Sequence, residues 1–318
     1  MNLIDFIFVP DFFFSILRIT APIIFATLAA VVCEKGGISN IGLEGTMMMS
    51  ALFGSLFAYY SGSWLIGVLM AIIIGVIVSI GMAFFAFNLK TNIILVGTAL
   101  NMIGSGGTIF FVRIITGITE GTQMTSTNGL INSSLQVPAI HIPIIKDIPI
   151  IGEIVSGHSL LTYLALFLVY LTWVLLYRTP LGLNIRSVGE NPNAASSVGV
   201  SVIKVKYMVL MLGGVLAGLG GAYMSMSYAM GFSLDMVAGR GFIALAAQAM
   251  GGGEPLGSTL AALVFGSAQA LAVKASALGV DSNLVSPIPY VVTILGLVVF
   301  AMIARRKLRR PNKVSKTA

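Results

Sequence analysis

The sequence predicts an all-α polytopic membrane protein, and two observations support that prediction. Hydrophobic residues make up 57% of the 318 residues and charged residues only 9%, whereas soluble domains carry about 25% charged residues. The charged residues also cluster, leaving apolar gaps of roughly 20 residues, which is the length of helix that crosses ~30 Å of hydrocarbon. Lipid rather than water is therefore expected to surround most of the chain.

The apolar runs predict about nine transmembrane helices, within a range of roughly eight to ten. The runs that are long enough to cross a bilayer are 13–32, 41–62, 64–88, 92–112, 159–177, 206–228 and 286–304. The segment 240–274 is divided by the turn sequence GGGEP, so it predicts two crossings, at about 240–252 and 256–274. The first is short, which is typical of a half-helix that enters a protein-lined cavity.

The lysine and arginine residues predict the orientation. With 178–206 and the C-terminal tail inside, nine alternating spans place thirteen basic residues inside and five outside or at the boundary. This distribution follows the positive-inside rule and puts the N-terminus outside. Residues 113–158 then form one large external loop of turns and short surface helices. Residues 305–318 form a basic cytoplasmic tail near anionic lipid, which accounts for the positive charge without a nucleic-acid partner.

The predicted spans form an inverted repeat. Four spans precede the external loop, four follow 178–206, and the span 159–177 joins the two groups, which begin in opposite directions. The second span of the first half opens with GGISNIGLEGTMMM, and that of the second half opens with AGRGFIALAAQAM. Glycine-interrupted segments at corresponding positions of two halves indicate a substrate path.

Polar residues in or near these segments are candidates for that path. The candidate pathway residues are Asn40, Glu44, Asn101, Ser105 and Gln248. A charge inside an apolar segment costs roughly 2.5–3.5 kcal/mol at the bilayer centre. Glu44 therefore either faces the pathway or is stabilised by the dipole at a helix start, and the sequence leaves both interpretations open. Asn101 and Ser105 share one helix face, where hydrogen bonds between helices are the favoured alternative.

The residues needed for enzymatic or metal chemistry are missing. Cys33 is the one cysteine, which excludes an intrachain disulfide or a multi-thiol metal site. His141 and His158 have no HExxH context. The run Gly251–Gly253 is not a Walker loop, because no Gly-Lys pair occurs in the sequence. We therefore expect a transport subunit that binds no cofactor and has no nucleotide site of its own.

The polar segment 178–206 predicts a docking site for a cytosolic partner. Pro192 suits the first turn of a short helix, preceded by residues that can cap it. The residues expected to take part in this contact are Glu190, Asn191, Ala194, Ala195 and Gly199. The alternative is that the segment only connects two spans. A connector would not need a segment of this length with so many small residues.

Two longer segments carry a family resemblance. VGENPNAASSVGVSVIKVKYMVLMLGGVLAGLGG and GFIALAAQAMGGGEPLGSTLAALVFGSAQAL resemble the membrane permeases of ABC importers for ribose-type sugars, branched-chain amino acids and nucleosides. The resemblance covers most of the chain. The signature EKGGISNIGLEGTMMMSA is similar to the nucleoside branch linked to basic membrane lipoproteins, whereas sugar and amino-acid branches differ at Asn40–Gly45. The resemblance implies a fold of the vitamin B12-permease type, the type II ABC importer.

The same resemblance implies partners and a function. It implies a second, often non-identical permease subunit, two cytosolic ATPase modules that use the ATP, and an external substrate-binding lipoprotein. In that fold a second cytoplasmic turn meets the ATPase, which adds Gly252, Gly253 and Glu254 to the expected coupling residues. We expect a nucleoside importer permease in the bacterial cytoplasmic membrane. The alternatives are a permease for a sugar such as ribose, or a stand-alone facilitator or ion-coupled carrier.

Overall fold

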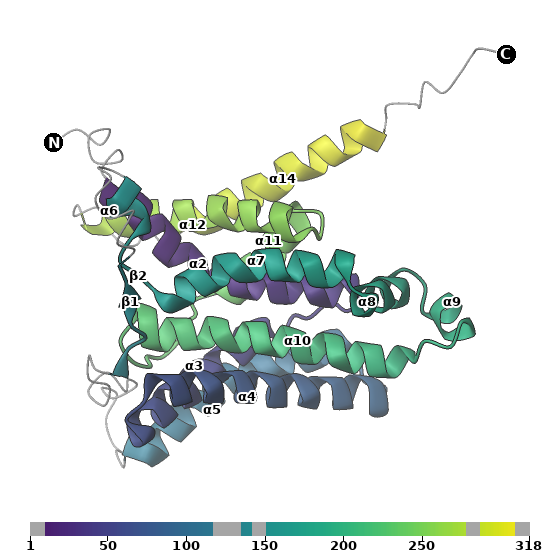
Figure 1. The fold of residues 1–318 in the computed structure, drawn as a ribbon, viewed down its shortest axis with the longest axis horizontal. Coiled ribbons are helices and arrows are strands. Elements are labelled where there is room, and N and C mark those ends of the chain that lie inside the picture. The colour runs from purple at the N-terminus through teal and green to yellow at the C-terminus, as the bar shows by residue number, and fades with distance from the viewer. Residues whose placement is uncertain (1–9, 117–134, 142–150, 278–286, 309–318) are drawn as a thin grey trace.

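The computed structural model describes residues 10–116, 135–141, 151–277 and 287–308, which form a helical bundle (Figure 1). Each predicted apolar run coincides with a helix. The helices are α2 (Pro10–Lys35), α3 (Leu43–Ser61), α4 (Trp64–Ala83), α5 (Ile93–Thr116), α6 (Ile151–Val155), α7 (Leu160–Arg178), α8 (Pro180–Glu190), α9 (Pro192–Ser197), α10 (Val202–Tyr223), α11 (Arg240–Met250), α12 (Pro255–Ala277) and α14 (Ile288–Leu308). Two π-helical turns, η1 (Phe84–Asn88) and η3 (Met224–Tyr228), extend α4 and α10.

Within the described residues, six helices are long and apolar enough to cross a membrane. They are α2, α4 with η1, α5, α7, α10 with η3, and α12. α3 and α14 fall outside this set, and α11 is too short. With 11 residues at ~1.5 Å per residue, α11 covers about half of the hydrocarbon thickness. The protein is therefore a multi-pass membrane protein, and the short helix predicted at 240–252 is confirmed.

The segments predicted inside and those predicted outside lie at opposite ends of the bundle. α8 and α9 project at one end, which we call the cytoplasmic end after the predicted orientation (Figure 1). At the other end lie α6 and a two-stranded ladder of β1 (Ala139–Ile140) and β2 (His158–Ser159), paired antiparallel. A short helix was expected in the external loop. The strand pair was not, because two residues per strand leave no periodic pattern.

Parts of two predicted segments lie outside the described residues. They are residues 117–134 and 142–150 of the external loop, and residues 309–318 of the basic tail.

Small residues let α10 pack closely against its neighbours. A methyl group added at Gly218 would lie 2.7 Å from the carbonyl oxygen of Ala71 in α4, and one at Gly214 would be equally crowded by the same helix. A methyl group at Gly221 would collide with the backbone of Met47 in α3. The small residues at these positions of α10 therefore allow close helix packing.

Candidate functional site

α3 begins near the middle of the bundle rather than at its end. After α2 ends at Lys35, residues 36–42 turn back and the next helix starts at Leu43. Met47, one turn further on, lies beside Gly220, which also packs against Pro22 near the midpoint of α2. The first turn of α3, with Glu44, is therefore at mid-depth, where an uncompensated charge is expensive.

The two glycine-interrupted segments meet at Glu44. The backbone N–H of Gly239 donates to Oε1 of Glu44 at 2.7 Å, and that of Gly241 donates to Oε2 at 2.6 Å. Gly239 has a φ of 77°, in the left-handed region that favours glycine. A methyl group at Gly241 would lie 2.7 Å from the backbone nitrogen of Glu44. The glycines at the start of α11 therefore allow the close approach of the two segments.

Two helix N-termini converge on this carboxylate. Glu44 is in the first turn of α3, and it also binds the N-terminus of α11. Each N-terminus carries roughly half a positive charge and N–H groups without partners inside the helix. The negative charge of the carboxylate compensates the partial positive charges of both N-termini. Glu44 thus binds a helix end, and that end belongs to the second glycine-interrupted segment.

Arg240, the first residue of α11, is buried beside this junction with only 5% of its surface exposed. Its Nη1 donates to the carbonyl oxygens of Met236 at 3.1 Å and Val237 at 3.0 Å. Its guanidinium lies 5.3 Å from the ring centroid of Tyr228, and the guanidinium of Arg18 lies 5.4 Å from the same ring. Arg240 is one of the five basic residues that the charge distribution along the sequence places outside or at the membrane boundary. The carbonyls and the aromatic ring explain how it is buried instead.

The amides of two other predicted pathway residues hold the turn before α3. Asn40 is 2% exposed, and its Nδ2 donates to Sγ of Cys33 at 3.7 Å. Asn101 of α5 accepts from the N–H of Gly45 at 2.8 Å and donates to the carbonyl of Ile41 at 3.0 Å. The structure therefore gathers Asn40, Glu44 and Asn101 around one turn.

The remaining two predicted pathway residues lie apart from that turn. Ser105 is on the exposed face of α5, where its hydroxyl donates to the carbonyl of Met102 at 3.2 Å. Gln248 is at the cytoplasmic end of α11, in the lining of a second polar site.

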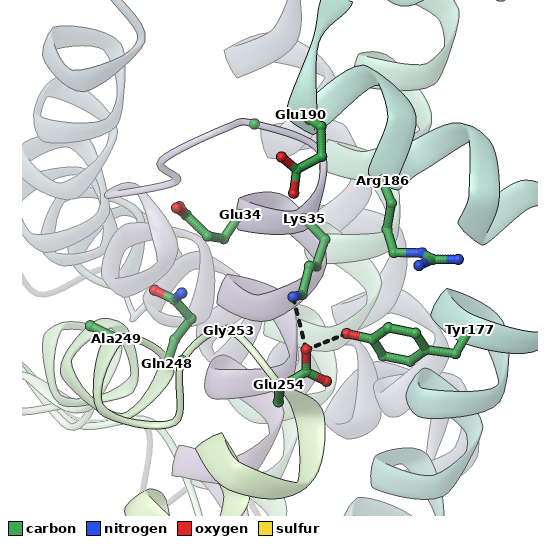
Figure 2. Close-up of a pocket in the computed structure, with 12 residues that line it drawn as sticks. Glu34, Lys35, Tyr177, Arg186, Glu190, Gln248, Ala249, Gly253 and Glu254 are labelled. Carbon is green, nitrogen blue, oxygen red and sulfur yellow. Dashed lines mark hydrogen bonds and ion pairs between the residues drawn. The ribbon is translucent and has the colours of Figure 1, made fainter. Parts of the chain in front are cut away.

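That second site is a cavity of about 720 Å³ at the cytoplasmic end (Figure 2). The ends of α2 and α7, helix α8 and the turn between α11 and α12 line it. Its lining includes Gln248 and the predicted coupling residues Glu190, Gly252, Gly253 and Glu254. The structure thus brings together residues from both segments that were expected to contact an ATPase.

One carboxylate joins the ends of α2 and α7 to the turn before α12 at this cavity. Oε1 of Glu254 lies 3.1 Å from Nζ of Lys35 and accepts a hydrogen bond of 2.6 Å from the hydroxyl of Tyr177 (Figure 2). Arg186 of α8 places its guanidinium 4.9 Å from the ring centroid of Tyr177. Sequence reasoning missed Lys35 and Tyr177 as partners. They are far from Glu254 in sequence, and Lys35 counts there only as one of the thirteen basic residues expected inside.

The pKa of Glu254 is lower than that of an ordinary glutamate. Burial alone raises the pKa of this carboxyl, but the hydrogen bonds from Tyr177 and Lys35 and the nearby positive charge outweigh it. The stabilisation is therefore present above the ordinary glutamate pKa and is lost as the pH falls through the lower pKa of the folded state. Because the side chain is 51% exposed, solvent screens the pair and its effect on folding is small.

The helix predicted after Pro192 is confirmed as α9. Oδ1 of Asn191 accepts from the N–H groups of Asn193 and Ala194, both at 3.1 Å, so it is the N-cap. The Ala195 side chain is only 3% exposed, whereas Ala194 is exposed.

The tip after α9 carries an apolar side chain that sequence reasoning did not single out. Val198 is 79% exposed, and Gly199 follows it with a φ of 87°. Exposed apolar residues are common on soluble faces, but this one directly follows α9, within the segment predicted to dock. The sequence signal that could have identified Val198 is its position at the end of the predicted short helix, directly before Gly199.

Residues 12–303 match the family described as branched-chain amino acid transport system / permease component. The protein belongs to this family. Its members are permease components, which agrees with a multi-pass helical bundle. The resemblance noted in the sequence is thereby confirmed.

Three relatives are nucleoside or guanosine permeases. The chain is 35% identical over 292 residues to the guanosine ABC transporter permease protein NupQ of Bacillus subtilis, covering 88% of each chain. It is 34% identical over 298 residues to the nucleoside ABC transporter permease protein NupC of Lactococcus lactis, covering 90% of each. It is 26% identical over 271 residues to NupB of the same bacterium, covering 78% of this chain and 69% of NupB.

Proposed function

We propose that this chain is a permease subunit of an ATP-driven nucleoside importer in the bacterial cytoplasmic membrane. The observation that carries the proposal is the similarity to NupQ and NupC over about nine tenths of the chain. A permease for a simple sugar such as ribose remains the alternative within the family.

The charges at mid-depth support a neutral solute. In other transporters the positive ends of interrupted helices receive anionic groups of the substrate. Here the N-terminus of α11 is bound by the protein's own Glu44, so an anionic solute gains nothing from it. Nucleosides are uncharged at neutral pH, and they offer ring faces and hydroxyls to polar groups such as Asn101. A charged solute would leave its charge poorly compensated in such a site.

The proposal includes three partners. They are a second, non-identical permease subunit, a cytosolic ABC ATPase that uses the ATP, and an external substrate-binding lipoprotein. NupB and NupC are two nucleoside permease proteins of one bacterium, and this chain resembles both. That pattern supports a pair of different permeases.

The proposed cycle is a rigid-body alternation of packed helices. The ATPases close on ATP and move α8, α9 and the turn at 251–254. The permease pair then changes from inward-facing to outward-facing, receives solute from the lipoprotein and releases it inside. We assign it a vitamin B12-permease-like arrangement of about nine spans in an inverted repeat, with the solute path beside the interrupted segments.

Reconstitution tests this function. The chain, its partner permease, the ATPase and the lipoprotein are placed in proteoliposomes, and uptake of labelled guanosine and uridine is measured with and without ATP. We expect ATP-dependent uptake of both, and none of leucine. Uptake by the permease pair without ATPase would instead indicate a facilitator or ion-coupled carrier, and uptake of ribose alone a sugar permease.

A further inference from the structure

The end of α2 lies between the two cytoplasmic segments that are expected to contact the ATPase. On one side it touches the end of α8. A methyl group at Gly37 would lie 3.1 Å from Cα of Gly189, and one at Gly189 would collide with the carbonyl oxygen of Lys35. The two backbones are thus in direct contact, so α8 cannot shift toward α2 without moving it.

On the other side, the end of α2 is attached to the turn at 251–254. Gly252 and Gly253 adopt φ values of 67° and 68°, which L-residues rarely tolerate. The resulting turn brings Glu254 to Lys35 at 3.1 Å and to the hydroxyl of Tyr177 at 2.6 Å. Figure 2 shows this carboxylate between the two donors. We call Lys35, Tyr177 and Glu254 the cytoplasmic cluster.

The turn at 251–254 continues directly into α11. This helix has 11 residues, so its two ends are ~15 Å apart. At the far end, the N–H groups of Gly239 and Gly241 bind Glu44. α11 is therefore fixed at both ends, by the cytoplasmic cluster below and by Glu44 at mid-depth.

We propose that Lys35 and Tyr177 are positioning residues for transport. Through Glu254 they join the α11–α12 turn to the ends of α2 and α7, so that both ATPase-facing segments move together and the movement reaches Glu44 through α11. This inference rests on the proposed function and names residues that transmit the movement without touching solute or ATP.

A second ion pair provides a matched control. Nζ of Lys274, near the end of α12, lies 2.6 Å from a carboxylate oxygen of Asp11, near the start of α2. The Lys35–Glu254 pair joins α2 to the turn that leads into α12, whereas this pair joins α2 to α12 itself at the external end. Its side chains are similarly exposed, 20% and 67% against 23% and 51%. If such ion pairs contributed only to general stability, removing either pair would affect the transporter equally.

The experiment uses the full reconstituted transporter. Glu254→Gln, Lys35→Gln and Tyr177→Phe are compared with Lys35→Arg and with the control Asp11→Asn. We measure solute taken up per ATP hydrolysed. We expect Glu254→Gln and Lys35→Gln to lower this ratio about threefold, because solvent screens a half-exposed ion pair and limits its strength. Tyr177→Phe should lower it less, while Lys35→Arg and Asp11→Asn keep the wild-type ratio.

Two results would overturn the proposal. One is a wild-type ratio in Glu254→Gln and Lys35→Gln, and the other is an equal loss in Asp11→Asn. If the wild-type transporter takes up no nucleoside, the proposed function fails, and hydrogen exchange then tests the cluster separately. Backbone amides of residues 251–254 should exchange faster in Lys35→Gln than in the wild type or Asp11→Asn. Unchanged exchange there would refute the cluster independently of transport.

Discussion

Glu44 is the residue on which the two glycine-interrupted segments converge. Its two carboxylate oxygens each accept one backbone N–H from the start of α11. Hydrogen bonds to a charged group are worth about 1.5–3 kcal/mol each, and a glutamine has only one acceptor oxygen. In Glu44→Gln, the amide nitrogen would face one of the two N–H groups, donor against donor.

We therefore expect Glu44→Gln to reduce nucleoside uptake more than it reduces the amount of assembled protein. α11 should lose its fixed position while the surrounding helix packing holds. Uptake in proteoliposomes and the amount of assembled transporter purified from equal quantities of membrane measure the two effects. Asn101→Asp provides a comparison at the same turn, because it keeps the acceptor but loses the donor to Ile41. Uptake at the wild-type rate would mean that the carboxylate only caps a helix.

Sequence alone identified Glu44 and Asn40 but not what they bind. A carboxylate in an apolar segment is visible in the composition, whereas its partners are 195 and 197 residues away. Arg240 shows the same limit. A lysine or arginine near a span end is assigned to the surface by charge, and only the fold supplies the ring and carbonyls that bury it.

At the scale of elements, the segment 178–206 can be tested most directly at α9. Sequence reasoning offered Ala194 and Ala195 as equivalent positions, and the structure separates them. Ala195 is 3% exposed, so a glutamate there would be buried by the protein itself and would disturb folding. Ala194 is exposed and gives the cleaner test of docking.

We expect Ala194→Glu to abolish nucleoside-stimulated ATP hydrolysis and uptake, because a bulky charge prevents α9 from seating in an ATPase groove. Ala194→Ser, which stays small, should keep both activities. Quantitative blots of membranes should show equal amounts of the two variants, since the residue lies outside lipid. Full uptake by well-inserted Ala194→Glu would show that α9 is a connector rather than a docking helix.

The helices themselves were largely predictable. In lipid every backbone polar group must be bonded within the segment, so long apolar runs become helices, and α2, α7 and α12 follow their predicted ranges closely. α8 and the strand pair were not predicted. α8 lies within the polar segment 178–206, and Thr179 is its N-cap. The ladder joins residues 139–140 to residues 158–159, a pairing between separate segments that no local pattern encodes.

At the scale of the whole molecule, the predicted sidedness and the positions of the contacts agree. Lys35, Glu254 and α8 meet at one end, while Asp11 and Lys274 meet at the other. The positions of the charged residues between successive spans were enough to assign each of these segments to one end of the bundle. It could not predict the 720 Å³ cavity between them, because that cavity depends on the angles at which four separate elements approach.

The solute class is a property of the whole transporter. A nucleoside and a ribose share neutral charge and hydroxyls, so polarity alone does not separate them, and the preference for nucleosides depends on the similarity to NupQ and NupC. In cells that carry the intact transporter, we expect unlabelled guanosine or uridine to suppress uptake of labelled uridine, and ribose at the same concentration to leave it nearly unchanged. The base would then contribute most of the recognition energy, through its ring face and its edge.

Ribose that competes as well as the nucleoside, or the absence of nucleoside uptake, would place this chain in the sugar branch. A deletion strain complemented with the Ala194→Glu variant supplies the background, because uptake through other carriers persists there.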